Sequence, residues 1–200
     1  FNPGDILLTY TYNDRMIFGG VTPTDSPLEI KLDKQLGVKF FLQRRELGFI
    51  NIGGKGTVTI DGKKDEVEPH DGYYISMGTK SVVFESADAK KPAKFYVVST
   101  PAHRAYPTKK LSYKDAIAMP MGDQEHMNKR TIHKYIDASI MDTCQLQMAD
   151  RGAVGAVLVS YKWVTPYLNQ VIHGILCHVI HMLVVWKRIS TQNLVQRILV

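Results

Sequence analysis

The feature that most constrains the fold is a run of short segments with alternating apolar and polar residues between positions 36 and 100, separated by turn signals. Residues 57–60 alternate cleanly and end at Asp61-Gly62, a pair that favours the type I′ turn of a β-hairpin. Short strands that recur about every 8–12 residues are typical of a sandwich or barrel and not of βαβ units. The sequence therefore predicts an all-β, antiparallel fold.

The expected strands cover residues 49–52, 57–60, 63–68, 73–76, 82–86 and 95–99. Turns are expected at residues 69–72 and 78–80, where Pro, Gly and Asp gather. We also expect a short helix over residues 112–118.

The composition favours a globular protein in a reducing compartment. Hydrophobic residues make up 44% and charged residues 22% of the chain, both close to a globular average. Two cysteines, Cys144 and Cys177, are too few for a disulfide framework, so we expect a cytoplasmic location. No basic segment leads into an apolar run at the start, so we expect no signal peptide; the chain begins with Phe1, so we expect the natural start to be missing.

The net charge of +6 does not predict nucleic-acid binding. Residues 149–200 hold one acid and five bases, and these bases are scattered, so the rest of the chain is nearly neutral. Nucleic-acid binding is expected to leave clustered Lys and Arg.

Two segments, residues 46–62 and 69–80, resemble the two conserved boxes of a cupin barrel. Metal-binding cupins place two His and a Glu in the first box and a His in the second. Glu46 fits the Glu position, but no His lies near Arg44, and Lys80 stands where the second-box His belongs. This resemblance implies a cupin-like barrel or sandwich without a metal.

A longer series of segments points to one family. Residues 14–20 read Asp-Arg-Met-Ile-Phe-Gly-Gly, and further segments follow in order at 34–38, 41–48, 51–54, 92–96, 101–103, 106–110, 130–132 and 143–146. Together they resemble, over residues 1–148, the 5-keto-4-deoxyuronate isomerase family of pectin breakdown, the 4-deoxy-L-threo-5-hexosulose-uronate ketol-isomerases.

The family resemblance implies an architecture and an activity. The fold would be the first half of a bicupin, and the second cupin of the family carries zinc. The reaction would convert 5-dehydro-4-deoxy-D-glucuronate to 3-deoxy-D-glycero-2,5-hexodiulosonate, so the partner would be a small sugar acid. Family members are hexamers, which implies a homo-oligomer.

The resemblance stops after Met148, which divides the chain into residues 1–148, a cupin-like domain with a connecting segment, and residues 149–200. When the codons of residues 173–187 are regrouped by one base, they can encode a Cys-His-Thr-His-Ala-Arg-Arg-Met-Glu stretch, which matches the metal-binding stretch of the family's second cupin. We therefore interpret residues 149–200 as a frameshifted remnant and expect it to pack poorly. The zinc ligands of the family are then absent from this chain.

Two other interpretations of this tail remain open. Residues 171–186 are apolar enough to suggest a membrane helix, but they are short of the roughly 20 residues needed, and His residues interrupt them. Cys177, His178 and His181 could be zinc ligands, but a fourth ligand is missing. We therefore expect neither a membrane nor a metal partner for this chain.

Three residues of the body are candidates for substrate binding: Arg44, Glu46 and Lys109. Because alternate residues of a strand face the same side, Arg44 and Glu46 are expected to share a face inside the barrel, as a structural pair or a substrate or subunit contact. Lys109 is expected in a solvated loop, with a clamp for the substrate carboxylate as the alternative. No catalytic residue is identified.

Two functions remain open at this stage. The first is a sugar-acid isomerase whose sequence is damaged in the catalytic half, so that this chain is inactive as written. The second is a non-catalytic cupin-type module for binding or oligomerisation.

Overall fold

The computed structural model describes residues 1–200 except 13–14, 32–33, 126–128, 151–156, 162–196 and 200. In the described part of the chain, regular structure consists of β-strands and two single-turn 3₁₀ helices, η1 (Lys34–Leu36) and η2 (Tyr113–Asp115). All strand pairings are antiparallel. The all-β expectation is confirmed.

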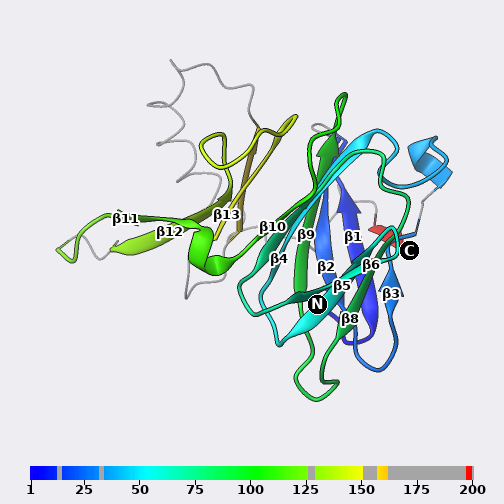
Figure 1. Cartoon of the computed structure of the whole chain (residues 1–200), viewed down its shortest axis with the longest axis horizontal. Coiled ribbons are helices and arrows are strands. Elements are labelled where there is room, and N and C mark those ends of the chain that lie inside the picture. The colour runs from blue at the N-terminus through cyan, green and yellow to red at the C-terminus, as the bar shows by residue number, and fades with distance from the viewer. Residues whose placement is uncertain (13–14, 32–33, 126–128, 151–156, 162–196, 200) are drawn as a thin grey trace.

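Seven strands form the largest sheet, which runs through the centre of the molecule (Figure 1). Their order across the sheet is β10-β7-β4-β9-β2-β1-β15. The bounds are β1 Asp5–Tyr10, β2 Ile17–Thr22, β4 Arg45–Asn51, β7 Gly72–Ile75, β9 Phe95–Pro101, β10 Lys109–Leu111 and β15 Arg197–Leu199.

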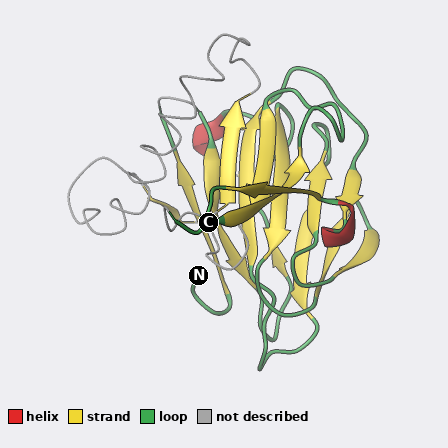
Figure 2. Ribbon diagram, turned by 90° about the vertical axis from the view of Figure 1, so that its left-hand side faces the viewer, coloured by secondary structure: helices red, strands yellow, loops and turns green. Residues whose placement is uncertain are grey.

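A four-stranded sheet covers one face of the large sheet and closes the first hydrophobic core. Its order is β3-β8-β5-β6, with bounds β3 Leu28–Glu29, β5 Gly56–Ile60, β6 Lys63–Val67 and β8 Val82–Ser86. Phe49 of β4 meets Phe84 of β8 edge to face at 5.2 Å and Phe95 of β9 at 5.3 Å. Two antiparallel sheets that pack through their apolar faces in this way form a sandwich (Figure 2).

The β5–β6 hairpin turns at Asp61-Gly62, as the sequence predicts. Both residues have positive φ angles, 45° for Asp61 and 85° for Gly62, which is the requirement of a type I′ turn. The Asp61 carboxylate accepts hydrogen bonds from the backbone N–H groups of Lys80 at 2.8 Å and Ser81 at 2.9 Å. This side chain therefore ties the hairpin to the turn before β8.

A third sheet lies against the opposite face of the large sheet, in the order β11-β12-β13-β14. Its bounds are β11 Ile117–Met121, β12 Arg130–Ile136, β13 Leu146–Asp150 and β14 Val157–Tyr161. A second hydrophobic core forms here, in which Ile136, Leu146 and Met148 pack with Ile50 and Tyr74. Strand β4 is therefore buried along its whole length, with one core on each side.

The region after β10 differs from the sequence expectation. Instead of a helix over residues 112–118, the chain makes the single turn η2, capped by the Ser112 side chain, and then enters β11 at Ile117. The prediction of a helix was wrong beyond one turn, because residues from Ile117 onward pair with β12.

Three pieces of the tail belong to described strands: residues 149–150 end β13, β14 pairs with β13, and β15 pairs with β1. The prediction of poor packing concerns residues that otherwise lie outside the described part of the chain. The same holds for the two alternatives that were not expected, a membrane helix over residues 171–186 and zinc binding by Cys177, His178 and His181. Across the residues that the structure describes, no helix has the length and apolarity needed to span a membrane.

Candidate functional site

The segment Arg44-Arg45-Glu46 enters β4 with its side chains in three different environments. Arg44 precedes the strand and is exposed, Arg45 is 7% exposed, and Glu46 is fully buried. By strand alternation, Arg45 shares a face with Leu47 and Phe49 of the first core, whereas Glu46 shares a face with Gly48 and Ile50, next to the second core. The expectation that Arg44 and Glu46 pair inside the barrel was therefore wrong.

The Glu46 carboxylate lies in a complete set of hydrogen-bond donors. Its Oε1 accepts from the Gln145 N–H at 2.7 Å, the Leu146 N–H at 2.8 Å and the Thr100 hydroxyl at 3.1 Å. Its Oε2 accepts from the Tyr74 hydroxyl at 2.8 Å and the Cys144 N–H at 3.0 Å. Since a carboxylate offers about four lone-pair sites, five donors leave no acceptor site for a substrate.

The electrostatics of this cluster keep Tyr74 a hydrogen-bond donor. Burial raises the pKa of the Tyr74 hydroxyl far above its usual value, and the neighbouring Glu46 charge raises it further. A neutral phenol beside a carboxylate donates a strong, charge-assisted hydrogen bond. Glu46 thus joins β4 and β7 of the large sheet to the bend before β13, which is a structural role.

The described residues do not fit the zinc site of a cupin. They contain no group of three or more His, Cys, Asp or Glu side chains able to hold a metal ion. Glu46, which fits the Glu position of the cupin box, lies next to the second core with its carboxylate oxygens taken up by donors, so it is not arranged as a metal ligand. His70 lies 3.9 Å from Asp150, and His133 lies 3.3 Å from the Tyr113 hydroxyl.

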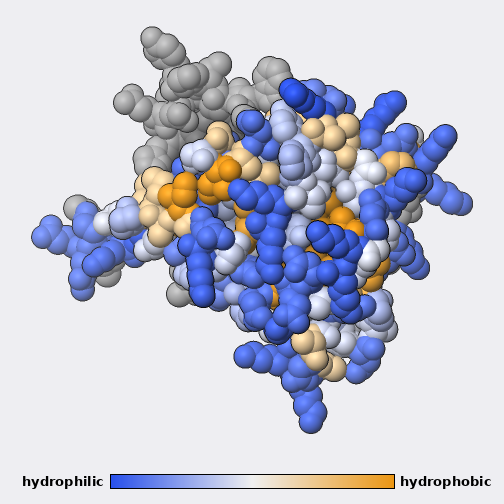
Figure 3. Space-filling view, in the orientation of Figure 1, coloured by the Kyte–Doolittle hydropathy of each residue, from blue (hydrophilic) through white to orange (hydrophobic). Residues whose placement is uncertain are grey.

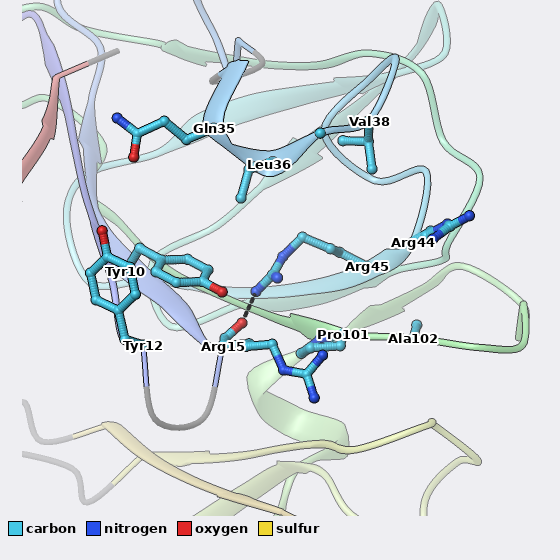
Figure 4. Close-up of a pocket in the computed structure, with 11 residues that line it drawn as sticks. Tyr10, Tyr12, Arg15, Gln35, Leu36, Val38, Arg44, Arg45, Pro101 and Ala102 are labelled. Carbon is cyan, nitrogen blue, oxygen red and sulfur yellow. Dashed lines mark hydrogen bonds between the residues drawn. The ribbon is translucent and has the colours of Figure 1, made fainter.

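A cavity of 420 Å³ opens where β1 and β9 end and β4 begins (Figure 4). The loop around η1 covers it, and its lining includes three arginines and two tyrosines: Arg15, Arg44, Arg45, Tyr10 and Tyr12. In Figure 4 the Arg45 side chain runs along the cavity, whereas the Arg44 guanidinium points away from it at the far rim. The described lining contains no acidic residue.

Arg45 is held at the base of this cavity. Its Nη2 donates to the carbonyl oxygens of Arg15 at 2.6 Å and Ser99 at 2.8 Å, and its Nε donates to the Ser99 hydroxyl at 3.1 Å. The guanidinium thereby fixes the backbone of Arg15, whose φ angle is 53°. A non-glycine residue in the left-handed region is uncommon and needs such support.

The three candidates from the sequence are not brought together. Arg44 lines the cavity, Glu46 lies on the other face of the sheet, and Lys109 is an exposed residue of β10, outside the cavity lining. Arg15, Tyr10 and Tyr12 also line the cavity and were not predicted from the sequence. Arg15 was part of a segment that resembles the family, but only the folded chain brings the ends of β1, β4 and β9 together.

Comparison with known proteins identifies relatives over most of the described body. The sequence model of the KduI/IolB family matches residues 21–152. A 4-deoxy-L-threo-5-hexosulose-uronate ketol-isomerase of Levilactobacillus brevis is 81% identical over 148 residues, which are 74% of this chain and 53% of that protein. Ketol-isomerase 1 of Enterococcus faecalis is 55% identical over 148 residues, with 74% and 54% covered. The chain thus spans about half the length of these curated relatives.

Among solved structures, an IolB-like protein from Salmonella typhimurium superposes with a TM-score of 0.52. The alignment covers 67% of this chain and 49% of that protein, at 14% sequence identity. At this identity the likeness shows a shared fold.

Proposed function

Because the chain belongs to the KduI/IolB family, we propose that it represents part of a 4-deoxy-L-threo-5-hexosulose-uronate ketol-isomerase. The observation that carries this proposal is the 81% identity over 148 residues to a protein of that name. The reaction converts 5-dehydro-4-deoxy-D-glucuronate to 3-deoxy-D-glycero-2,5-hexodiulosonate by moving hydrogen between adjacent carbons. In this proposal the enzyme is a cytoplasmic homo-oligomer, a hexamer as in its family, that acts on small sugar acids from pectin.

The isomerase reaction requires catalytic groups that the described residues do not supply. An aldose–ketose isomerase needs a base near the C–H bond and an electrophile at the carbonyl oxygen. Glu46 is saturated by five donors, and the described part of the chain offers no cluster of metal ligands. We therefore assign no catalytic residue within it and place the zinc of the proposed enzyme in the second cupin of the full-length protein.

In this proposal residues 1–148 form the supporting cupin-like domain and residues 149–200 the frameshifted remnant. The chain as written is then inactive, and the runner-up function is a cupin-type module for binding or oligomerisation without catalysis. The observation that favours this second function is the saturation of Glu46, the acid that the sequence placed in a metal-binding box.

Isomerase activity of two versions of the protein tests the proposal. The chain as written and a version with the frame of residues 149–200 restored are purified, supplied with zinc and assayed on the 5-dehydro uronate. We expect turnover from the corrected version alone, abolished by a chelator. Chelator-sensitive turnover by the uncorrected chain would show that the chemistry is wrongly placed, and an inactive corrected version would favour the non-catalytic module.

Lys109 serves as the remaining candidate for substrate binding in the corrected enzyme. Replacement of Lys109 by Gln removes one exposed positive charge. If Lys109 clamps the substrate carboxylate, KM should rise by about tenfold with kcat unchanged, because the interaction is the same in the ground and transition states. An unchanged KM would assign Lys109 to the solvated surface.

A further inference from the structure

We propose that the outer edge of β1 is a docking surface for a second copy of this chain, with the two β1 strands paired antiparallel across a two-fold axis. In the chain as written, β15 lies along this edge and keeps the copies apart. The contact would supply one interface of the homo-oligomer proposed above. The inference rests on β1 itself, however, and its test needs no isomerase activity.

The β1 edge lacks the features that usually prevent an edge strand from pairing with another chain, which are short length, charged side chains and proline. Among the described residues up to position 150, the other edge strands have them. β10 and β3 are three and two residues long, β6 carries four charged residues, and β11 contains Pro120. β1 instead runs for six residues and carries its one charge at its first position, Asp5. Such an edge favours pairing with a further strand.

The backbone groups of alternate β1 residues point away from β2. The Thr11 N–H donates to the Met16 carbonyl at 2.8 Å, in the same register as the β1–β2 pairs. Successive residues of an antiparallel strand direct their N–H and C=O groups to opposite sides. The odd-numbered residues of β1 therefore bond to β2, and the even-numbered ones face the outer edge: Ile6, Leu8 and Tyr10.

The position of β15 shows that this edge accepts an antiparallel strand. Figure 1 draws β15 in red beside the C mark. Its register with β1 is Leu7–Leu199, Leu8–Ile198 and Thr9–Arg197. β15 lies beyond residues 21–152, which the family model matches. The edge therefore takes up a strand from outside that region, through backbone pairing that depends little on sequence.

A second β1 strand fits this edge by symmetry. With the axis at Leu8, the two Leu8 residues pair with each other, and Ile6 of each copy pairs with Tyr10 of the other. All the outward backbone groups of β1 then gain partners. Asp5 lies opposite Thr11 in this register, so no two like charges meet directly. Because both copies use the same strand, the contact closes as a dimer and leaves no further edge to extend.

Freeing the edge tests the proposal. Ile198→Pro in the full chain removes the N–H group opposite Leu8 and so weakens the hold of β15. The contact is small, so we expect weak association of this proline variant, with half of its chains paired at about 0.1 mM. The parent should associate at least about tenfold more weakly. Sedimentation equilibrium measures the mass, which should rise from that of one chain to that of two.

Amide exchange resolved by NMR identifies the surface that forms the contact. When the proline variant associates, the outward N–H groups of Ile6, Leu8 and Tyr10 should exchange at least about tenfold more slowly. Those of Leu7 and Thr9 should be protected at every concentration, because β2 already bonds them. This alternation along one strand is a signature that association through another surface would not produce.

A charge on β1 tests the same surface from the other side. Thr9→Lys, added to the proline variant, should weaken association by about tenfold or more, because lysine on an edge strand opposes pairing. Thr131→Lys, at an exposed position of β12, is the matched control and should leave association unchanged. Urea midpoints equal to that of the proline variant would confirm that both variants fold.

Three results would overturn the proposal. The first is a folded proline variant that stays monomeric up to about 1 mM. The second is a Leu8 amide that is protected in the monomeric proline variant, which would show that another segment of the chain covers the edge. The third is a dimer in which the Leu8 amide exchanges freely, which would place the contact elsewhere.

Discussion

The backbone N–H of Leu146 donates a 2.8 Å hydrogen bond to the carboxylate of Glu46, across 100 positions of sequence. Glu46 is fully buried on β4, and Leu146 opens β13 of the third sheet. The bonds from Cys144 and Gln145 to the same carboxylate make three successive N–H donors converge on one acid. This convergence fixes the third sheet to the large sheet.

Replacing Glu46 by Gln should destabilise the protein by about 2–4 kcal/mol, because the amide keeps the shape but turns an NH₂ group toward donors. The free energy of unfolding from urea titration measures the effect. Glu68→Gln, an exposed acid paired with Lys55 at 2.8 Å, is the matched control and should change stability by less than about 0.5 kcal/mol. A loss below about 1 kcal/mol in Glu46→Gln would refute the anchoring role.

Gly48 gives a second test of the contact between the sheets. A Cβ atom at this position would lie 2.4 Å from the Met148 sulfur and 2.8 Å from Ile136 and Leu146 side-chain carbons. Gly48→Ala should therefore cost about 1–3 kcal/mol through overpacking.

A shorter side chain opposite Gly48 should relieve this clash. Met148→Ala alone should cost about 2–5 kcal/mol, because it leaves a cavity in the second core. The double variant Gly48→Ala/Met148→Ala should lose less free energy of unfolding than the two single variants lose together. We expect the difference to be at least about 0.5 kcal/mol. Strict additivity in urea unfolding would show that the two residues do not meet.

Replacing Gly62 in the β5–β6 turn should lower the stability of the protein for conformational reasons alone. Gly62 has a φ of 85°, and an added Cβ would meet no atom within 4 Å. Gly62→Ala should therefore destabilise by about 1–2 kcal/mol through the left-handed backbone alone. Lys63→Ala, at the next and exposed position, serves as the control in thermal unfolding. Equal midpoints for both variants would contradict the type I′ geometry.

The partly buried Tyr96 of β9 predicts a loss of stability at alkaline pH. Burial raises the pKa of Tyr96 from 10.0 to about 12. Above pH 10 the unfolded chain releases this proton while the folded chain retains it, so stability falls as pH rises toward 12, by about 1.4 kcal/mol per pH unit for each such proton.

Tyr96→Phe should make the free energy of unfolding fall less steeply with pH, because the contribution of one proton to the slope is removed. Urea titrations at a series of pH values above 10 measure it, and phenolate absorbance reports the ionisation directly. Tyr12→Phe, at an exposed position, is the matched control. A slope unchanged in the Tyr96 variant would show that this hydroxyl ionises equally in both states.

Local sequence patterns predicted the first sandwich because its signals lie within a few residues of each other. The Asp61-Gly62 turn and the alternating strands that flank it needed no distant partner, and the structure confirms them. Asn51, at the end of β4, is fully buried, and its side chain donates to the nearby Gly54 carbonyl at 2.7 Å.

The candidate site was harder to predict because it depends on contacts between distant residues. Glu46 and Arg45 both lie on a strand that is buried on both faces. The alternation of side chains along the strand therefore could not show which face borders the cavity and which borders the third sheet. The partners of Glu46 are backbone groups near position 145, which carry no sequence signature. The sequence therefore singled out Glu46 and allowed a structural role for it, but it could not identify the partners that give Glu46 that role.

The double burial of β4 has a consequence for synthesis of the protein on the ribosome. The first core is complete once β9 has emerged, but Ile50, Tyr74 and Glu46 stay uncovered until residues 144–148 follow. At about 5–20 residues per second, the intervening stretch takes about 2–9 s to appear. During that interval the nascent chain presents an apolar sheet face around a solvated carboxylate, and we expect a chaperone that recognises exposed apolar surface to engage it then.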